Sequence, residues 1–160
     1  MKKHFRSIFL FAFIGVVFFG CKPDPTFPAI PALTFKEFRQ PAGSDSLVVV
    51  FSFTDGDGDI GVAPTDSDTN MVLCVYAPDA NGIFQQVPDI NTPNQFDSLI
   101  YKYRIPNLTP GQIGLEGDIY VTILNKSFLP RDTLQFNAFL LDQSDNKSNI
   151  VRTETVILTN

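Results

Sequence analysis

Short runs of alternating apolar and polar residues, separated by turn-forming residues, recur throughout residues 32–160 of the chain. In the clearest run, Tyr101 and Tyr103 alternate with Lys102 and Arg104. A period of two places one set of side chains in a core and the other in solvent, which is typical of a half-buried β-strand. Glycine, proline, Asn and Asp residues separate the runs, and no run has a convincing helical period. The alternation therefore predicts an all-β domain.

The number and spacing of these runs favour two packed sheets. Seven short strands within roughly 125 residues predict an immunoglobulin-like antiparallel β-sandwich, and a small barrel is the alternative. The chain has no Trp and no pair of cysteines to join the sheets, so the prediction depends on strand number and alternation. The predicted strands cover residues 33–39, 47–53, 71–76, 99–105, 119–123, 134–140 and 151–157.

The first twenty residues have the composition of a secretory signal. Lys2, Lys3 and Arg6 precede an uncharged apolar run over residues 8–19. A helix of that length rises only about 18 Å, and a bilayer requires roughly 20 apolar residues. A charged start, a short apolar run and a small residue at its end are the marks of a secretory signal. We therefore interpret residues 1–20 as a signal peptide.

The end of this segment, Phe18-Phe19-Gly20-Cys21, resembles a bacterial lipobox. The resemblance implies cleavage before Cys21 and attachment of diacylglycerol to its thiol; an ordinary signal followed by a chance cysteine is the alternative. Residues 21–31 contain four prolines, which favour an extended polyproline II tether rising about 3.1 Å per residue. Residues 32–160 then form one domain.

Charge and the placement of histidine restrict the function classes. Removal of the signal peptide leaves 9 of the 12 basic residues against 17 acidic ones, so the net charge changes from −5 to −8. Such a surface repels nucleic acid. The only histidine, His4, lies in the signal, and no nucleophile is paired with a base in any recognisable motif. We therefore expect no enzymatic activity.

An acidic loop follows the second predicted strand and has the sequence Asp55-Gly56-Asp57-Gly58-Asp59-Ile60-Gly61. Carboxylates at alternate positions, with glycines that allow tight curvature, can direct several oxygens toward one cation. Ca²⁺ prefers six to eight oxygen ligands. The loop is not an EF-hand, because Ile60 replaces the required glycine. Asp55, Asp57 and Asp59 are therefore the predicted metal ligands, and a solvated acidic turn is the alternative.

A second polar segment, residues 142–149, precedes the last predicted strand. In an immunoglobulin-like sandwich the loops after the second and sixth strands emerge at the same end. Asp142 and Asp145 are therefore predicted to approach the acidic loop and to assist metal binding.

The lipobox, the DGDGDIG loop and the closing LLDQSDNKSNIV segment together resemble Bacteroidota-type outer-membrane lipoproteins with an immunoglobulin- or cadherin-like domain. The resemblance implies that a lipid anchors the chain in the outer membrane, and such lipoproteins can face the cell surface. It also implies Ca²⁺ at the acidic loop. It implies no catalytic residue. Three triplets match an O-glycosylation pattern of such bacteria but are also ordinary turn sequences at strand starts; they begin at Asp45, Asp97 and Asp132.

These observations lead to a functional expectation with one alternative. We expect a membrane-anchored envelope protein with a binding or structural accessory role, and a protein or glycan as its partner. The alternative is a carbohydrate-binding module of a polysaccharide-uptake system, for which the four tyrosines would supply stacking surfaces: Tyr76, Tyr101, Tyr103 and Tyr120.

Overall fold

The computed structural model describes residues 26–62, 68–89, 98–106 and 113–159. These residues form an all-β protein, and among them the only helix is a short 3-10 turn, η2 (Lys126–Phe128). The strands are β1 (Ala32–Arg39), β2 (Ser46–Asp55), β3 (Met71–Pro78), β4 (Phe84–Gln86), β5 (Ile100–Tyr103), β6 (Leu115–Leu124), β7 (Thr133–Leu140), β8 (Val151–Arg152) and β9 (Val156–Ile157).

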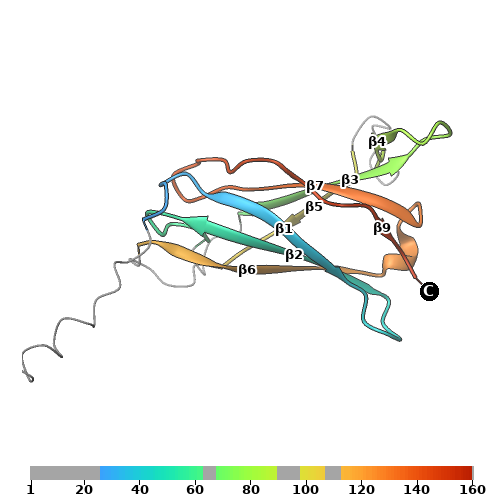
Figure 1. The fold of residues 1–160 in the computed structure, drawn as a ribbon, viewed down its shortest axis with the longest axis horizontal. Helices are drawn as coiled ribbons and strands as arrows, with labels where there is room; N and C mark the ends of the chain where they lie inside the picture. The colour runs from blue at the N-terminus through green and yellow to red at the C-terminus, as the bar shows by residue number, and fades with distance from the viewer. Residues whose placement is uncertain (1–25, 63–67, 90–97, 107–112, 160) are drawn as a thin grey trace, which may run out of the picture.

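The strands form two antiparallel sheets that pack face to face (Figure 1). One sheet has the order β1-β2-β6. In the other, β3 pairs with β7 along one edge and with β4 and β5 along its other edge, while β8 and β9 both pair with β7. This arrangement places β1, β2 and β6 in the A, B and E positions of the immunoglobulin scheme, and β3 and β7 in the C and F positions. The predicted antiparallel β-sandwich is confirmed.

The core lies between the sheets and follows the predicted alternation. Val49 and Phe51 of β2 are fully buried. Along β7, fully buried residues alternate with half-buried ones from Thr133 to Leu140, and Leu134 and Phe136 are among the buried set. β-Branched and aromatic side chains suit this pleated, half-buried surface. Ile60, from the acidic loop, is also in the core with 1% of its surface exposed. The acidic loop is thus attached to the sandwich by an apolar side chain.

Two details differ from the predicted strands. The short β4 was not predicted, and the last strand is divided into β8 and β9. The division has a local cause, because the buried Thr153 uses its hydroxyl to accept the N–H of Phe136 at 2.9 Å. A side chain thereby replaces part of the backbone ladder. Cys74 is half-buried, since it lies at one of the outward-facing positions of β3.

The two ends of the described chain lie at opposite ends of the sandwich (Figure 1). The chain enters beside the end of β2, where the acidic loop begins, and the C terminus lies beyond β9 at the far end. The loop between β1 and β2 and the turn η2 also lie at the far end. They contact each other there, since Asp45 accepts two hydrogen bonds from Ser127. The acidic loop and the N-terminal segment therefore share one end of the molecule.

Candidate metal centre

The three predicted ligands of the acidic loop lie close together. Asp55 is the last residue of β2, and Asp57 and Asp59 follow in the loop. One carboxylate oxygen from each lies within 4.8 Å of the others. Gly58 adopts a left-handed conformation with φ 74° between the second and third ligands, which a residue with a side chain would adopt at a cost. The local sequence therefore curves the backbone so that the carboxylates converge.

The burial of these carboxylates leaves two oxygens without partners. Asp55 is fully buried, and its Oδ2 accepts the backbone N–H of Ile60 at 3.1 Å, but its Oδ1 has no hydrogen-bond partner. Asp59 shows the same division, since its Oδ2 accepts the Ser144 hydroxyl at 2.7 Å and its buried Oδ1 has no partner. Buried polar atoms are nearly always satisfied. Two such orphaned carboxylate oxygens in one cluster fit the requirements of a cation.

The electrostatics of the cluster favour uptake of a positive charge. Burial first, and then the neighbouring charges of Asp57, Asp59 and Asp142, raise the pKa of Asp55 to about 6, against the opposing hydrogen bond from Ile60. Burial also raises the pKa of Asp59, although the Ser144 hydroxyl lowers it. Both shifts mean that the ionised forms are destabilised. A proton or a metal ion at this point would relieve that destabilisation.

The segment of residues 142–149 meets the acidic loop, as its position in the sandwich predicted. Ile60 and Asp142 form an isolated antiparallel bridge. The Gln143 backbone N–H donates to the Asp59 carbonyl at 3.2 Å, and its side-chain amide donates to the Gly61 carbonyl at 2.8 Å. These contacts join two loops that are more than 80 residues apart in the sequence.

The two further predicted ligands do not join the group of close carboxylates, which among the described residues comprises Asp55, Asp57 and Asp59. Asp142 uses both oxygens within its own turn: Oδ1 accepts the N–H groups of Ser144 and Asn146, and Oδ2 accepts the Asn146 amide. Asp145 is exposed and left-handed, with φ 63°. The negative charge of Asp142 raises the pKa of Asp55 and of Asp59. Its carboxylate oxygens, however, hold together the turn that follows β7.

Sequence reasoning missed the side chains that hold the loops together. Ser144 and Gln143 read as ordinary turn residues, because only the fold brings them to Asp59. A further contact was also missed: the Gly56 N–H donates to the Pro28 carbonyl at 2.8 Å. The glycine between two acids was the one available signal that the backbone is closely approached at that point.

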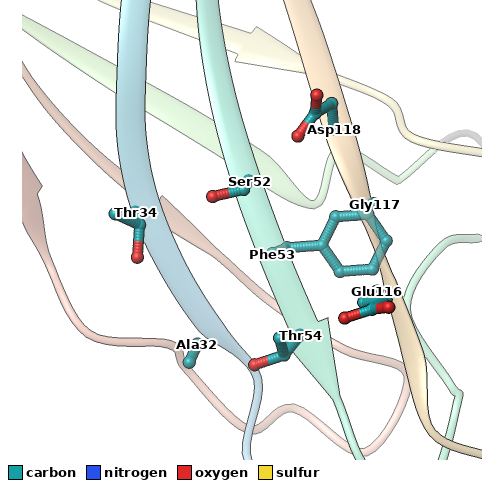
Figure 2. Close-up of a pocket in the computed structure, with 8 residues that line it drawn as sticks. All are labelled: Ala32, Thr34, Ser52, Phe53, Thr54, Glu116, Gly117 and Asp118. Atoms are coloured by element: carbon teal, nitrogen blue, oxygen red, sulfur yellow. The ribbon is translucent and has the colours of Figure 1, made fainter.

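A shallow groove of about 540 Å³ lies on the outer face of the β1-β2-β6 sheet (Figure 2). The hydroxyls of Thr34, Ser52 and Thr54 line it, and Glu116 lies at its β6 side. No tyrosine lines it, and its only ring, Phe53, is 5% exposed and points toward Gly117. The groove therefore offers hydrogen-bonding groups but no face on which a sugar could stack.

The four tyrosines are dispersed over the sandwich. Tyr101 and Tyr103 stack on each other and are half-buried, with ring centroids 6.4 Å apart. Arg152 lies over Tyr76, and Arg39 lies over the exposed Tyr120 on the opposite sheet. No observation therefore favours the carbohydrate-binding alternative specifically.

Several sequence predictions fall outside the described residues. These are the signal peptide, the lipidation site Cys21, the start of the tether and Asp97, the first residue of one glycosylation triplet. Of the other triplets, Ser46 is buried with 9% exposure, and its hydroxyl lies 2.8 Å from that of Ser44. Asp45 receives two hydrogen bonds from Ser127, which agrees with its interpretation as a turn residue.

No protein family model, curated protein or solved structure matches this chain. Within the described part of the chain, no helix has the length and apolarity needed to cross a membrane. The geometry of the acidic loop is therefore the main guide to function.

Proposed function

We propose that this chain is a lipid-anchored protein of the bacterial outer membrane, in which one Ca²⁺-binding β-sandwich serves a non-catalytic binding or structural role. The Ca²⁺ site is supported most directly by two buried oxygens without hydrogen-bond partners, Asp55 Oδ1 and Asp59 Oδ1, within a group of three converging carboxylates. The signal-like segment and Cys21 support export and anchoring. The oxygen-only ligand set supports a hard cation.

The choice of Ca²⁺ follows from the chemistry of the loop. Histidine is absent after His4, and the described thiol, Cys74, faces outward from the other sheet, so the donors are oxygens. Mg²⁺ demands near-octahedral geometry and keeps several waters, whereas Ca²⁺ accepts six to eight oxygens in irregular arrangements. Three carboxylates leave places for backbone carbonyls and water. Extracellular Ca²⁺ modules function with dissociation constants of about 10⁻⁴–10⁻³ M.

Repulsion among the carboxylates gives the ion a structural role. Two unit charges 4.8 Å apart, the upper limit for this group, repel by about 3.5 kcal/mol at an effective dielectric near 20, and by less where solvent screens the exposed Asp57. A bound divalent cation converts this repulsion into coordination. Because only the folded chain brings the three carboxylates together, the ion stabilises the native state by mass action.

Thermal unfolding in Ca²⁺ and in chelator tests the proposal. At a hundredfold excess over the dissociation constant, the stabilisation is about 2.7 kcal/mol, which corresponds to a rise of roughly 10 °C in melting temperature. Asp57→Asn should remove most of the rise in melting temperature, because it takes away one of the three proposed ligands. Since Asp57 is exposed, the substitution should not disturb the core. Asp132→Asn is the matched control, because Asp132 is an exposed acid just before the start of β7, away from the acidic loop. A wild-type melting temperature that is indifferent to millimolar Ca²⁺ would refute the proposal.

A further inference from the structure

The N-terminal segment, at Phe27 and Pro28, lies across the acidic loop at Gly56. The Gly56 N–H donates to the Pro28 carbonyl at 2.8 Å. A Cβ atom on Gly56 would lie 2.1 Å from the Phe27 carbonyl oxygen and 2.6 Å from that of Pro28, which are distances that no side chain tolerates. The absence of a side chain at position 56 is therefore what allows Phe27 and Pro28 to lie against the loop.

Gly56 also separates two of the three converging carboxylates. Its N–H binds the N-terminal segment, and its carbonyl accepts the Gly114 N–H at 3.0 Å. Asp55 and Asp57 flank it directly. A change in the curvature that brings these carboxylates together must therefore move the peptide group on which Pro28 rests. The ligand geometry and the docking of the segment share one piece of backbone.

A second clip holds the same segment to the second loop of the site. Asn149 accepts the Leu33 N–H at 2.8 Å and donates to the Leu33 carbonyl at 2.9 Å. Asn149 belongs to residues 142–149, whose Ser144 binds Asp59. Residues 28–33 are therefore attached at one end to the acidic loop and at the other to the loop that braces it.

From these contacts we infer that the cation held by Asp55, Asp57 and Asp59 also fixes Phe27 and Pro28 against Gly56, so that filling the site sets how the sandwich is held by its N-terminal tether. The inference rests on the proposed Ca²⁺ site. When the site is filled, the loop keeps the curvature that places Gly56 beneath the segment. When it is empty, repulsion among the carboxylates opens the loop and releases the segment. By linkage, a docked segment strengthens Ca²⁺ binding by the factor with which Ca²⁺ strengthens docking.

The chain contains no tryptophan, so Thr26→Trp in the full-length protein in detergent provides a single fluorescent reporter beside the crossing. Thr26 is exposed, and the substitution leaves the loop unchanged. We expect Ca²⁺ to raise the fluorescence anisotropy of this tryptophan and to reduce its quenching by acrylamide, and we expect a chelator to reverse both effects. Calorimetry on the same sample measures Ca²⁺ binding independently.

Gly56→Ala in the reporter background keeps all three carboxylates but places a Cβ against Phe27. We expect the Ca²⁺-dependent rise in anisotropy to be lost and Ca²⁺ binding to weaken by about tenfold, a typical coupling factor. Gly43→Asn is the matched control, because an added Cβ on Gly43, in the loop between β1 and β2, meets nothing within 4 Å and Asn tolerates the left-handed backbone at φ 73°; this variant should respond like the parent.

The two failures are distinguishable. Ca²⁺ binding with unchanged anisotropy in the parent reporter would overturn the inference and leave the proposed function standing, whereas no Ca²⁺ binding at millimolar concentration would refute the proposed function itself. Because the parent reporter alone decides between these outcomes, the test survives even if Gly56→Ala does not fold.

Discussion

At the scale of a single residue, Asp55 combines complete burial with a carboxylate oxygen that has no partner. Its pKa in the folded chain is about 6, against an ordinary value of 3.8, so the native state holds the proton more tightly than the unfolded chain does. Stability then falls as pH rises, because the folded state binds more protons between those two values. Once ionised, the buried Asp55 therefore destabilises the metal-free protein above about pH 6.

We therefore predict that, in chelator, the urea midpoint of the wild type falls as pH rises from about 4 to about 6, at a cost on the order of 2 kcal/mol. Asp55→Asn preserves the side-chain volume and an acceptor for Ile60, so it should remove this decline and be more stable than wild type at pH 7 without Ca²⁺. The same variant should lose its response to Ca²⁺. Urea titrations at several pH values measure both effects; a wild type whose stability rises over that window would contradict the assignment.

At the scale of an element, the turn after β7 is a brace whose two acids have different roles. Asp142 accepts three hydrogen bonds within the turn, from Ser144 and Asn146. Asp142→Ala leaves these donors unmet and should cost about 1–3 kcal/mol even in chelator. Asp145→Asn should change the melting temperature little in either condition, because Asp145 is exposed and Asn tolerates its left-handed backbone. A large loss of Ca²⁺ affinity in Asp145→Asn would restore Asp145 as a ligand.

The strands themselves were largely predictable, and the contacts between loops were not. Alternation located β2, β5 and β7, because the period of a strand is a local property of the sequence. The break between β8 and β9 could not be foreseen, since it depends on a hydrogen bond between the Thr153 hydroxyl and a neighbouring strand. β4 has only three residues, too few for a period to be recognised.

The candidate site was predictable in the same uneven way. Asp55, Asp57 and Asp59 were found because their spacing carries the chemistry within one loop. That Asp142 would reach the loop followed from sheet topology. Its role as a brace did not follow, because which atoms a carboxylate accepts from is decided by the geometry of the turn. The burial of Asp55, the strongest sign of a cation, was likewise a property of the fold alone.

At the scale of the whole molecule, the proposed membrane anchor depends on one thiol, that of Cys21. Cys21→Ser removes the atom that would carry diacylglycerol, so we predict that the variant is found either as soluble protein or as an uncleaved precursor. Fractionation with detergent, followed by mass determination, distinguishes these states from wild type. Cys74→Ser is the control, because Cys74 lies in β3 and should leave membrane partitioning unchanged. A processed Cys21→Ser protein that still partitions into detergent would rule out the lipid anchor.

The placement of the two chain ends at opposite ends of the sandwich has a mechanical consequence. A force between them acts along the strands, so the backbone hydrogen bonds that join β1 to β2 are loaded together in shear and must fail at nearly the same moment. Where both ends leave from the same side of a sheet, the bonds instead open one after another at low load. A sandwich loaded lengthwise resists pulling, and forced unfolding is governed by the unfolding rate. Pulling on the two ends of the described chain should therefore meet more resistance than pulling the same strands apart from one side.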